Sequence, residues 1–236
     1  MLLHVDSLAA GYGRVRVLHG ISIDVDNEPV GLFGPNGHGK TTLLRTLSGL
    51  IAPEAGTVTY AGRDITGKAP QSIVEAGLVH VPQGSTLLPR MTVLEALTLG
   101  AYSKRAWGRR GKTIEHVFAL FPRLAERRHQ RCNTLSGGER QMAAIGAGLM
   151  GCPQLLMLDE PTLGLAPKVR SDLVKAIRTI ANTEVGLLLV DQDIDMLLGL
   201  CGRLYLIEQG RVTLDVRDPS QIQHRDVLKR YFGSAA

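Results

Sequence analysis

Residues 34–41 have the types and the spacing of a loop that binds nucleotide phosphates. Gly34-Pro35-Asn36-Gly37-His38-Gly39-Lys40-Thr41 fits the pattern G-x-x-x-x-G-K-[ST], in which glycines let backbone N–H groups turn inward around an anion. Lys40 can reach the β- and γ-phosphates, and the Thr41 hydroxyl, followed by Thr42, is placed to face Mg²⁺. A strand expected at residues 29–33 and a helix at residues 41–47 flank the loop, which argues against a chance glycine-rich turn.

Two adjacent acids end a second apolar stretch, Leu155-Leu156-Met157-Leu158-Asp159-Glu160. Ligands of open α/β sheets bind at the carboxyl ends of the strands, so we expect Asp159 to help Thr41 hold Mg²⁺ there. Glu160 is suited to orient or deprotonate an attacking water. A lone Asp-Glu pair is more simply explained as a helix start, but the phosphate loop upstream favours the catalytic interpretation.

A further segment, Leu135-Ser136-Gly137-Gly138-Glu139-Arg140-Gln141, has the spacing of a helix start. Ser136 and Glu139 fit a capping box, and the two glycines between them leave the first helical amides open to an anion. Because the chain contains one nucleotide loop, we expect this second anion site to serve a nucleotide that is held mainly by another subunit.

A framework of alternating strands and helices must position these segments. Period-two alternation and short apolar runs predict strands at residues 2–8, 15–25, 29–33, 57–61, 78–81, 155–158, 186–190, 204–207 and 212–214. Helical spacing and caps predict helices at residues 41–47, from 92 onward, and at 114–121, 167–180, 194–200 and 219–231. We expect a turn at residues 53–56 and an exposed loop at residues 103–111. The prediction is a single domain, residues 1–236, with a helical subdomain inserted at roughly residues 85–135.

The segment from Leu135 to Glu139 resembles the signature motif of ATP-binding cassette (ABC) ATPases, and it stands where that family has it, between the phosphate loop and the acidic strand end. The resemblance covers essentially the whole chain. It implies an α/β phosphate-loop NTPase fold with a mixed-sheet core, an antiparallel β subdomain and an inserted α-helical subdomain. It also implies a head-to-tail dimer, with two ATP molecules between the phosphate loop of one subunit and the signature of the other.

Single residues can be assigned through the same resemblance. Tyr12 matches an aromatic residue that stacks on adenine, and an ordinary turn tyrosine is the alternative. Gln83 matches a glutamine that contacts Mg²⁺ or the attacking water and senses the membrane partner, and a surface loop glutamine is the alternative. Gln192 replaces the usual histidine; its amide can bond a γ-phosphate but cannot carry a proton. Ala166 replaces a common aspartate, so both changes bear on hydrolysis rather than on nucleotide binding.

Residues 89–93, 118–124 and 158–167, together with the Gln192 segment, closely resemble the second ATPase subunit of branched-chain amino acid importers. This implies an ATPase at the cytoplasmic face of the membrane, paired with a sister ATPase that retains the histidine, or with itself when isolated and soluble. Two permeases would carry the pair, and a solute-binding protein would feed them. Importers of urea and short-chain amides share much of the pattern and remain open, as do an export cassette and a non-transport cassette.

Composition sets wider limits. The 236 residues carry a net charge of +5, and much of the basic excess lies between Lys104 and Arg140. We interpret it as a solvated helical surface, with a dedicated binding patch as the alternative, and expect no nucleic acid partner. Neither an apolar run of about 18 residues nor a basic n-region with a cleavage site is present, so a membrane span and a signal peptide are not expected. Cys132, Cys152 and Cys201 have no C-x-x-C spacing and are expected to be reduced and structural.

Overall fold

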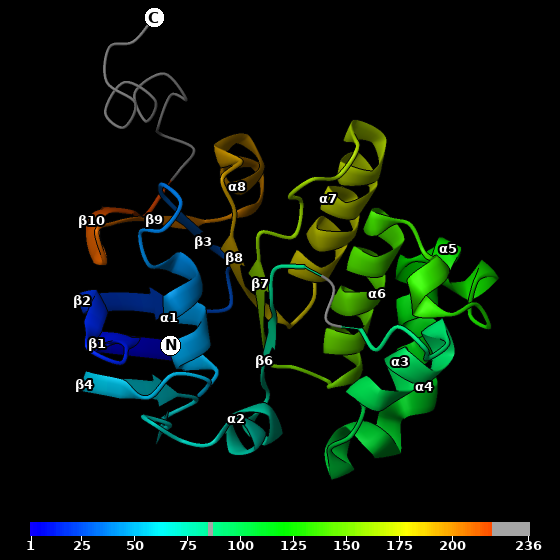
Figure 1. Cartoon of the computed structure of the whole chain (residues 1–236), viewed down its shortest axis with the longest axis horizontal. Coiled ribbons are helices and arrows are strands. Elements are labelled where there is room, and N and C mark those ends of the chain that lie inside the picture. Colours follow the sequence, from blue (N-terminus) through cyan, green and yellow to red (C-terminus); the bar gives the residue numbers. More distant parts are fainter. Residues whose placement is uncertain (85–86, 219–236) are drawn as a thin grey trace, which may run out of the picture.

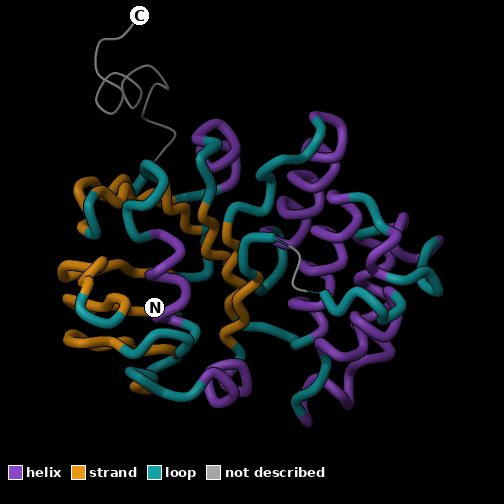
Figure 2. The backbone as a smooth tube through the Cα atoms, in the orientation of Figure 1, coloured by secondary structure: helices purple, strands orange, loops and turns teal. Residues whose placement is uncertain are grey.

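The computed structural model describes residues 1–84 and 87–218, so the helix expected at residues 219–231 lies outside the described part. Within these residues the strands form two sheets (Figure 1; Figure 2). The larger sheet has the order β10-β9-β3-β8-β7-β6. Its strands are β3 (Val30–Phe33), β6 (Leu78–Val81), β7 (Leu155–Asp159), β8 (Gly186–Val190), β9 (Arg203–Glu208) and β10 (Arg211–Val216).

The larger sheet is parallel from β9 to β6, and β10 joins it as the antiparallel arm of a hairpin. Every residue of β3, β7 and β8 is buried, as expected for parallel strands covered on both faces. Along β7 the side chains alternate, with Leu155 and Met157 in one apolar core and Leu156 and Leu158 in the other. The segments that follow β3, β7 and β8 therefore leave the same edge of the sheet, in the middle of the molecule.

One face of this sheet is covered by helix α1 (Lys40–Leu47) and by the smaller antiparallel sheet, whose order is β2-β1-β4-β5. Its strands are β1 (Leu3–Tyr12), β2 (Val15–Val25), β4 (Pro53–Tyr60) and β5 (Arg63–Asp64). The turn predicted at residues 53–56 is wrong, because Pro53 and Ala55 pair with β1. The Pro and Gly signals mark an irregular strand instead. A Cβ at Gly56 would lie 2.5 Å from the Asp6 carbonyl oxygen, where the register shifts.

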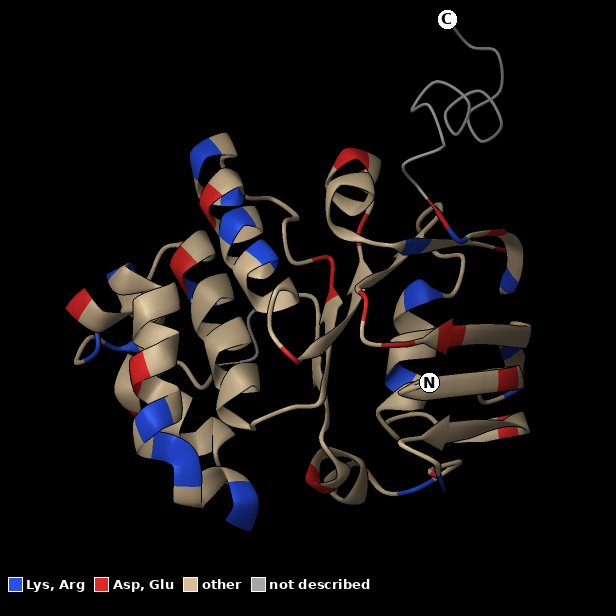
Figure 3. Cartoon of the chain, turned by 180° about the vertical axis from the view of Figure 1, so that it is seen from behind, with Lys and Arg blue, Asp and Glu red and all other residues tan. Residues whose placement is uncertain are grey.

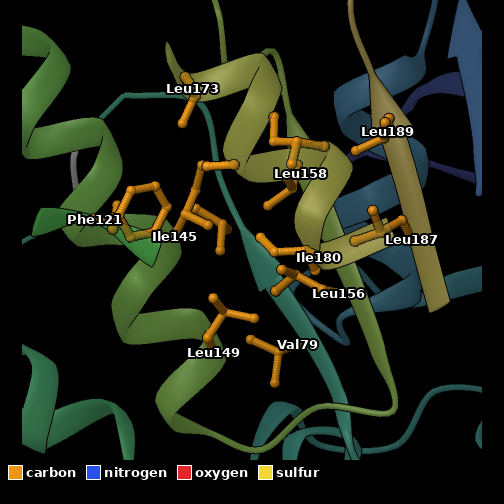
Figure 4. Packing of buried hydrophobic residues seen from close by; sticks show 14 of the residues in the cluster. Val79, Phe121, Ile145, Leu149, Leu156, Leu158, Leu173, Ile180, Leu187 and Leu189 are labelled. Carbon is orange, nitrogen blue, oxygen red and sulfur yellow. The ribbon is translucent and has the colours of Figure 1, made fainter. Parts of the chain in front are cut away.

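The opposite face is covered by helices. Besides α1, the described part of the chain contains the helical elements α2 (Pro70–Ala76), α3 (Val93–Gly100), α4 (Lys104–Leu120), α5 (Pro122–Glu126), η1 (Cys132–Thr134), α6 (Gly137–Met150), α7 (Pro167–Ala181) and α8 (Ile194–Leu200). Of these, α2 buries Ile73 in the same core as α1. Figure 4 shows Leu156, Leu158 and Leu187 of the sheet packing toward Ile145 of α6 and Ile180 of α7. In the described part of the chain, every helix is too short or too polar to cross a lipid bilayer.

The loop predicted at residues 103–111 is wrong, since residues 104–111 belong to α4 and Ser103 is its N-cap. Ser103 caps the helix by accepting a hydrogen bond from the Ala106 N–H at 3.2 Å, and the Ala106 side chain is fully buried. Gly108 and Gly111 interrupt the apolar spacing, which is why the sequence pattern does not reveal the helix. In contrast, the capping box predicted before α3 is confirmed.

Histidine 80 gives the fold a specific acid sensitivity. His80 lies in β6 with its Nδ1 3.2 Å from the Ser48 hydroxyl, and burial, helped by the charge of Arg45, lowers its pKa from 6.5 to about 4. As the pH falls below 6.5, His80 becomes protonated in the unfolded chain but stays neutral in the folded chain. The free energy of unfolding therefore decreases until the pH reaches about 4, where the folded chain is protonated too. We expect this histidine to remove up to about 3 kcal/mol of stability over that interval.

Urea denaturation of the wild type and of His80→Gln at several pH values between 7 and 4 measures the effect. The decrease in the free energy of unfolding between pH 7 and pH 4 should be smaller in His80→Gln, because glutamine does not take up a proton in this range. His116→Gln, which changes an exposed histidine of α4, is the matched control and should behave like the wild type. Equal acid sensitivity of all three proteins would contradict this role of His80.

Candidate nucleotide-binding site

The loop between β3 and α1 is held from behind by the β9–β10 hairpin. The Gly210 N–H donates to the His38 carbonyl at 3.0 Å, and the Gln209 N–H donates to His38 Nδ1 at 3.2 Å. Gly34 has φ +140°, and a Cβ there would lie 2.2 Å from the Ile207 carbonyl oxygen. Glycine is required at this position because the loop turns sharply and passes directly over β9.

The front of the same loop is open. Gly37 has φ +78°, and no atom of the described residues lies within 4 Å of the place where its Cβ would stand. Gly39, with φ +106°, is the N-cap of α1; no side chain caps this end, and no acid occurs in the first turn. The first amides of α1 are therefore free to bind an anion, and the helix dipole favours one.

Lysine 40 lies across the mouth of the loop. Its Nζ donates to the carbonyl oxygens of Gly34 at 2.6 Å and Pro35 at 3.0 Å, and the residue is only 4% exposed. Burial lowers the pKa of Lys40, while the carboxylates of Glu160 and Asp159 act in the opposite direction. The Lys40 ammonium is thus held at the loop by two neutral carbonyl oxygens. A phosphate group can replace them, because its charge-assisted hydrogen bonds with the ammonium are stronger.

The two acids at the end of β7, Asp159 in the strand and Glu160 after it, have different surroundings. Asp159 is 1% exposed, and neither carboxylate oxygen accepts a hydrogen bond from any residue that the structure describes. Burial raises the pKa of Asp159, while the Thr41 hydroxyl and the charge of Lys40 act in the opposite direction. Glu160, in contrast, accepts hydrogen bonds from the side-chain amides of Gln83 at 2.9 Å and Gln192 at 3.1 Å. Its backbone has φ +46°, a conformation that turns its side chain out of the line of the strand.

A cleft of about 430 Å³ joins the phosphate loop, Lys40 and Glu160, while the buried Asp159 does not line it. It is lined by Asn36, Gly37, Gly39, Lys40, Thr41, Thr42, Gln83, Glu160, Leu163 and Gln192. Residues predicted from four separate parts of the sequence are thus brought to one place at the carboxyl edge of the sheet. Leu163 is the one lining residue that the sequence analysis does not single out.

The remaining predicted residues lie outside this cleft. Gly34, Pro35 and His38 form the back of the loop, while Tyr12 ends β1, is 47% exposed and accepts a hydrogen bond from Arg45 at 3.3 Å. The segment from Ser136 to Glu139 begins α6, which packs on the opposite face of the larger sheet from α1 (Figure 1). Within one chain, the predicted second anion site is therefore separated from the phosphate loop.

The predicted capping box at this second site is confirmed. The Glu139 N–H donates to the Ser136 hydroxyl at 3.3 Å, and the Ser136 N–H donates to the Glu139 carboxylate at 2.9 Å. The two glycines differ in role. A Cβ at Gly138 would lie 2.2 Å from a methyl group of Val169, whereas a Cβ at Gly137 would meet no described atom within 4 Å. Gly138 therefore allows close packing against α7, and Gly137 leaves an open amide surface.

A buried link that was not predicted from the sequence connects the Glu160 and Gln192 segments. The Thr162 hydroxyl donates to one carboxylate oxygen of Asp191 at 2.8 Å, and the Asp193 N–H donates to the other at 2.9 Å. Burial raises the pKa of Asp191, which the hydrogen bond from Thr162 partly offsets. The sequence does contain one indication of this link. Asp191 directly follows the apolar β8 strand and directly precedes Gln192.

We expect Thr162→Val to destabilise the protein by about 1–3 kcal/mol, because a buried carboxylate loses its hydroxyl donor. Looser positioning of Glu160 should also lower kcat for ATP, with KM less affected. Urea denaturation and steady-state phosphate release measure the two effects. Thr162→Ser, which keeps the hydroxyl, should retain most of the wild-type stability and kcat. Thr179→Val, on the exposed side of α7, is the control. A Thr162→Val protein with unchanged stability would contradict the importance of this link.

The comparisons with known proteins agree with this geometry. The model of the family described as "ABC transporter" matches residues 18–163. The high-affinity branched-chain amino acid transport ATP-binding protein BraG of Pseudomonas aeruginosa is 36% identical over 98% of this chain and 100% of its own length. A probable branched-chain amino acid transport ATP-binding protein, LivF, of Archaeoglobus fulgidus is 31% identical, with 98% and 99% covered.

Among solved structures, the ADP conformation of an ATP-binding cassette of an ABC transporter superposes with a TM-score of 0.83. It is 26% identical, and the match covers 99% of both chains. The α/β fold expected from the sequence, with its mixed and antiparallel sheets and its helices, is thereby confirmed. The family model matches more than half of this chain, and relatives align with nearly all of it. The chain therefore belongs to the ABC transporter family, as one of its ATP-binding ATPase subunits.

Proposed function

We propose that this chain binds and hydrolyses ATP to drive an importer of branched-chain amino acids or a related small polar solute. The observation that carries the ATPase chemistry is the single cleft in which Lys40, Thr41 and Glu160 meet. The choice of solute is supported by the names of two relatives aligned over 98% of this chain. An importer of urea or short-chain amides is the alternative, because the ATPase itself does not contact the solute.

The residues of the site fit ATP with Mg²⁺. The open amides of residues 36–41 and the Lys40 ammonium would hold the phosphates, and the exposed face of Tyr12 would hold the adenine ring. Asp159 has two buried carboxylate oxygens, and Thr41, which lines the cleft, offers a hydroxyl close to that carboxylate. Together with Gln83, this oxygen set suits Mg²⁺, which prefers one or two protein oxygens in addition to phosphate. When bound, the ion would neutralise charge that builds up on the phosphates.

Glu160 would be the general base for the attacking water. Its two carboxylate oxygens are held by the amides of Gln83 and Gln192, so the group is oriented before the nucleotide arrives. Gln192 would then exchange this contact for the γ-phosphate while still donating a hydrogen bond. Because an amide does not titrate, this position would contribute no proton transfer.

The second anion site would complete the nucleotide site of a neighbouring protomer. Its support is the open surface at Gly137, which no residue of the same chain covers among those described, and its distance from the phosphate loop. We propose a head-to-tail pair, formed with a sister ATPase in the transporter or with a second copy when the chain is isolated. Two permease subunits would carry this pair at the cytoplasmic face of the membrane, and a solute-binding protein would deliver the solute to them.

Purification of the native complex, followed by reconstitution into vesicles, tests the proposal. We expect two permease subunits and a sister ATPase to co-purify, and ATP hydrolysis to rise when a leucine-loaded binding protein is added. Stimulation by a urea-loaded or amide-loaded binding protein instead would favour the alternative solute. Co-purification with exporter subunits, or stimulation by RNA and not by permeases, would overturn the importer assignment.

A further inference from the structure

The first half of α4 carries a basic surface that the ATPase site does not use. Lys104, Arg105, Arg109, Arg110 and Lys112 are all exposed, and no acid occurs before Glu115. We call residues 104–112 the basic segment. Figure 3 shows the blue residues of this helix gathered at one of its ends, at the edge of the molecule.

The composition of this segment opposes the helix it forms. Lys104 and Arg105 occupy its first turn, where the helix dipole disfavours positive charge, and no acid compensates them there. Gly108 and Gly111 each cost a helix interior about 1 kcal/mol relative to alanine. Neither glycine is required by packing, because a Cβ at either position would meet no described atom within 4 Å. Stability of the isolated protein therefore does not explain these residues.

The charges of the segment are not neutralised by acids within the described part of the chain either. Among the described residues, none of its five cations forms an ion pair with an acid, although Arg105 donates to the Cys152 carbonyl at 2.9 Å. The guanidinium of Arg110 lies 4.1 Å from the centre of the Trp107 ring. Trp107 is 49% exposed and Tyr102, just before the helix, is 51% exposed. Cations and amphipathic aromatic rings thus share one exposed end of the helix.

We propose that the basic segment binds the surface of an anionic phospholipid bilayer. Lysine and arginine attract anionic headgroups, and tryptophan and tyrosine are favoured at the boundary between headgroups and acyl chains. A bilayer is favoured over nucleic acid because the family acts at membranes and because Arg110 already covers one face of the ring on which a base would stack. The inference does not depend on which solute is transported.

Trp107 makes the test direct, because it is the single tryptophan of the chain. The full chain is mixed with vesicles of phosphatidylcholine alone or with one quarter phosphatidylglycerol, and both sedimentation and tryptophan emission are measured. We expect binding and a blue shift of the emission only with the anionic vesicles. Both should be largely lost in 0.5 M salt, where exposed charges are screened. The triple variant Arg109→Gln, Arg110→Gln, Lys112→Gln should bind roughly 100-fold more weakly.

The matched control is Arg63→Gln, Lys68→Gln, Lys175→Gln, which removes the same charge from other exposed positions. It should bind anionic vesicles like the wild type. Equal loss in both triple variants would show an effect of net charge alone and overturn the proposal. So would unchanged tryptophan emission on bound vesicles, or tighter binding to poly(U) RNA than to the anionic vesicles.

Discussion

Replacing Glu160 with glutamine is expected to slow ATP hydrolysis by roughly 10²–10⁴-fold while leaving ATP binding intact. The substitution keeps the shape of the side chain, and the amides of Gln83 and Gln192 can rotate to keep hydrogen bonds with it. A glutamine oxygen, however, cannot take a proton from water at neutral pH. Phosphate release from the reconstituted transporter and equilibrium binding of ATP measure the two properties separately.

The control for this experiment is Glu184→Gln, which makes the same chemical change at an exposed position between α7 and β8. It should hydrolyse ATP like the wild type. Turnover of Glu160→Gln at the wild-type rate would remove Glu160 from the role of general base. A variant that no longer binds ATP would instead show that the contacts with Gln83 and Gln192 maintain the cleft.

The phosphate loop, the acidic strand end and most strands could be predicted because each depends on local sequence. Buried parallel strands require apolar runs, and the turn at Gly34, with φ +140°, requires glycine. These apolar runs and glycines can be recognised in the sequence without knowing which distant residues they contact. The capping boxes at Thr92 and Ser136 were predictable for the same reason, since both partners lie within four residues.

The features that escaped prediction depend on contacts between distant residues. Nothing in the sequence connects Thr162 with Asp191, which become partners only when β7 and β8 pair side by side. Likewise, Pro53 lies in a strand because β1 is there to pair with it. In α4, the burial of Ala106 and the cap at Ser103 outweigh two glycines and a basic first turn. Local preference was overridden by tertiary packing in each case.

The adjacent acids Asp159 and Glu160 lie in two different surroundings at one strand end, which suits the two different roles proposed for them. Asp159 continues β7, and its carboxylate is buried without a donor, so it is prepared for a cation. Glu160 departs from the strand through a positive φ, which brings its carboxylate to two amide donors in the cleft. The change in backbone direction between the two residues would therefore separate the proposed ion ligand from the proposed base.

This arrangement predicts that Asp159→Asn acts in opposite directions on stability and on function. Without ligands the variant should be more stable than the wild type by about 1–2 kcal/mol, because burial disfavours the Asp159 charge by more than Thr41 and Lys40 favour it. For a chain of this length that raises Tm by roughly 2–8 °C. The same change should reduce Mg²⁺-dependent ATP hydrolysis by more than about 100-fold, since the ion loses its protein carboxylate.

Thermal unfolding of both proteins without ligand, with ATP and EDTA, and with ATP and Mg²⁺ separates the two effects. Magnesium should add stability to the ATP-bound wild type, because a ligand of the folded state raises Tm, and should add little to Asp159→Asn. Asp172→Asn, an exposed aspartate on α7, is the control for the loss of one negative charge. A variant that is less stable without ligand but still responds to Mg²⁺ like the wild type would show that Asp159 supports the fold and that another group holds the ion.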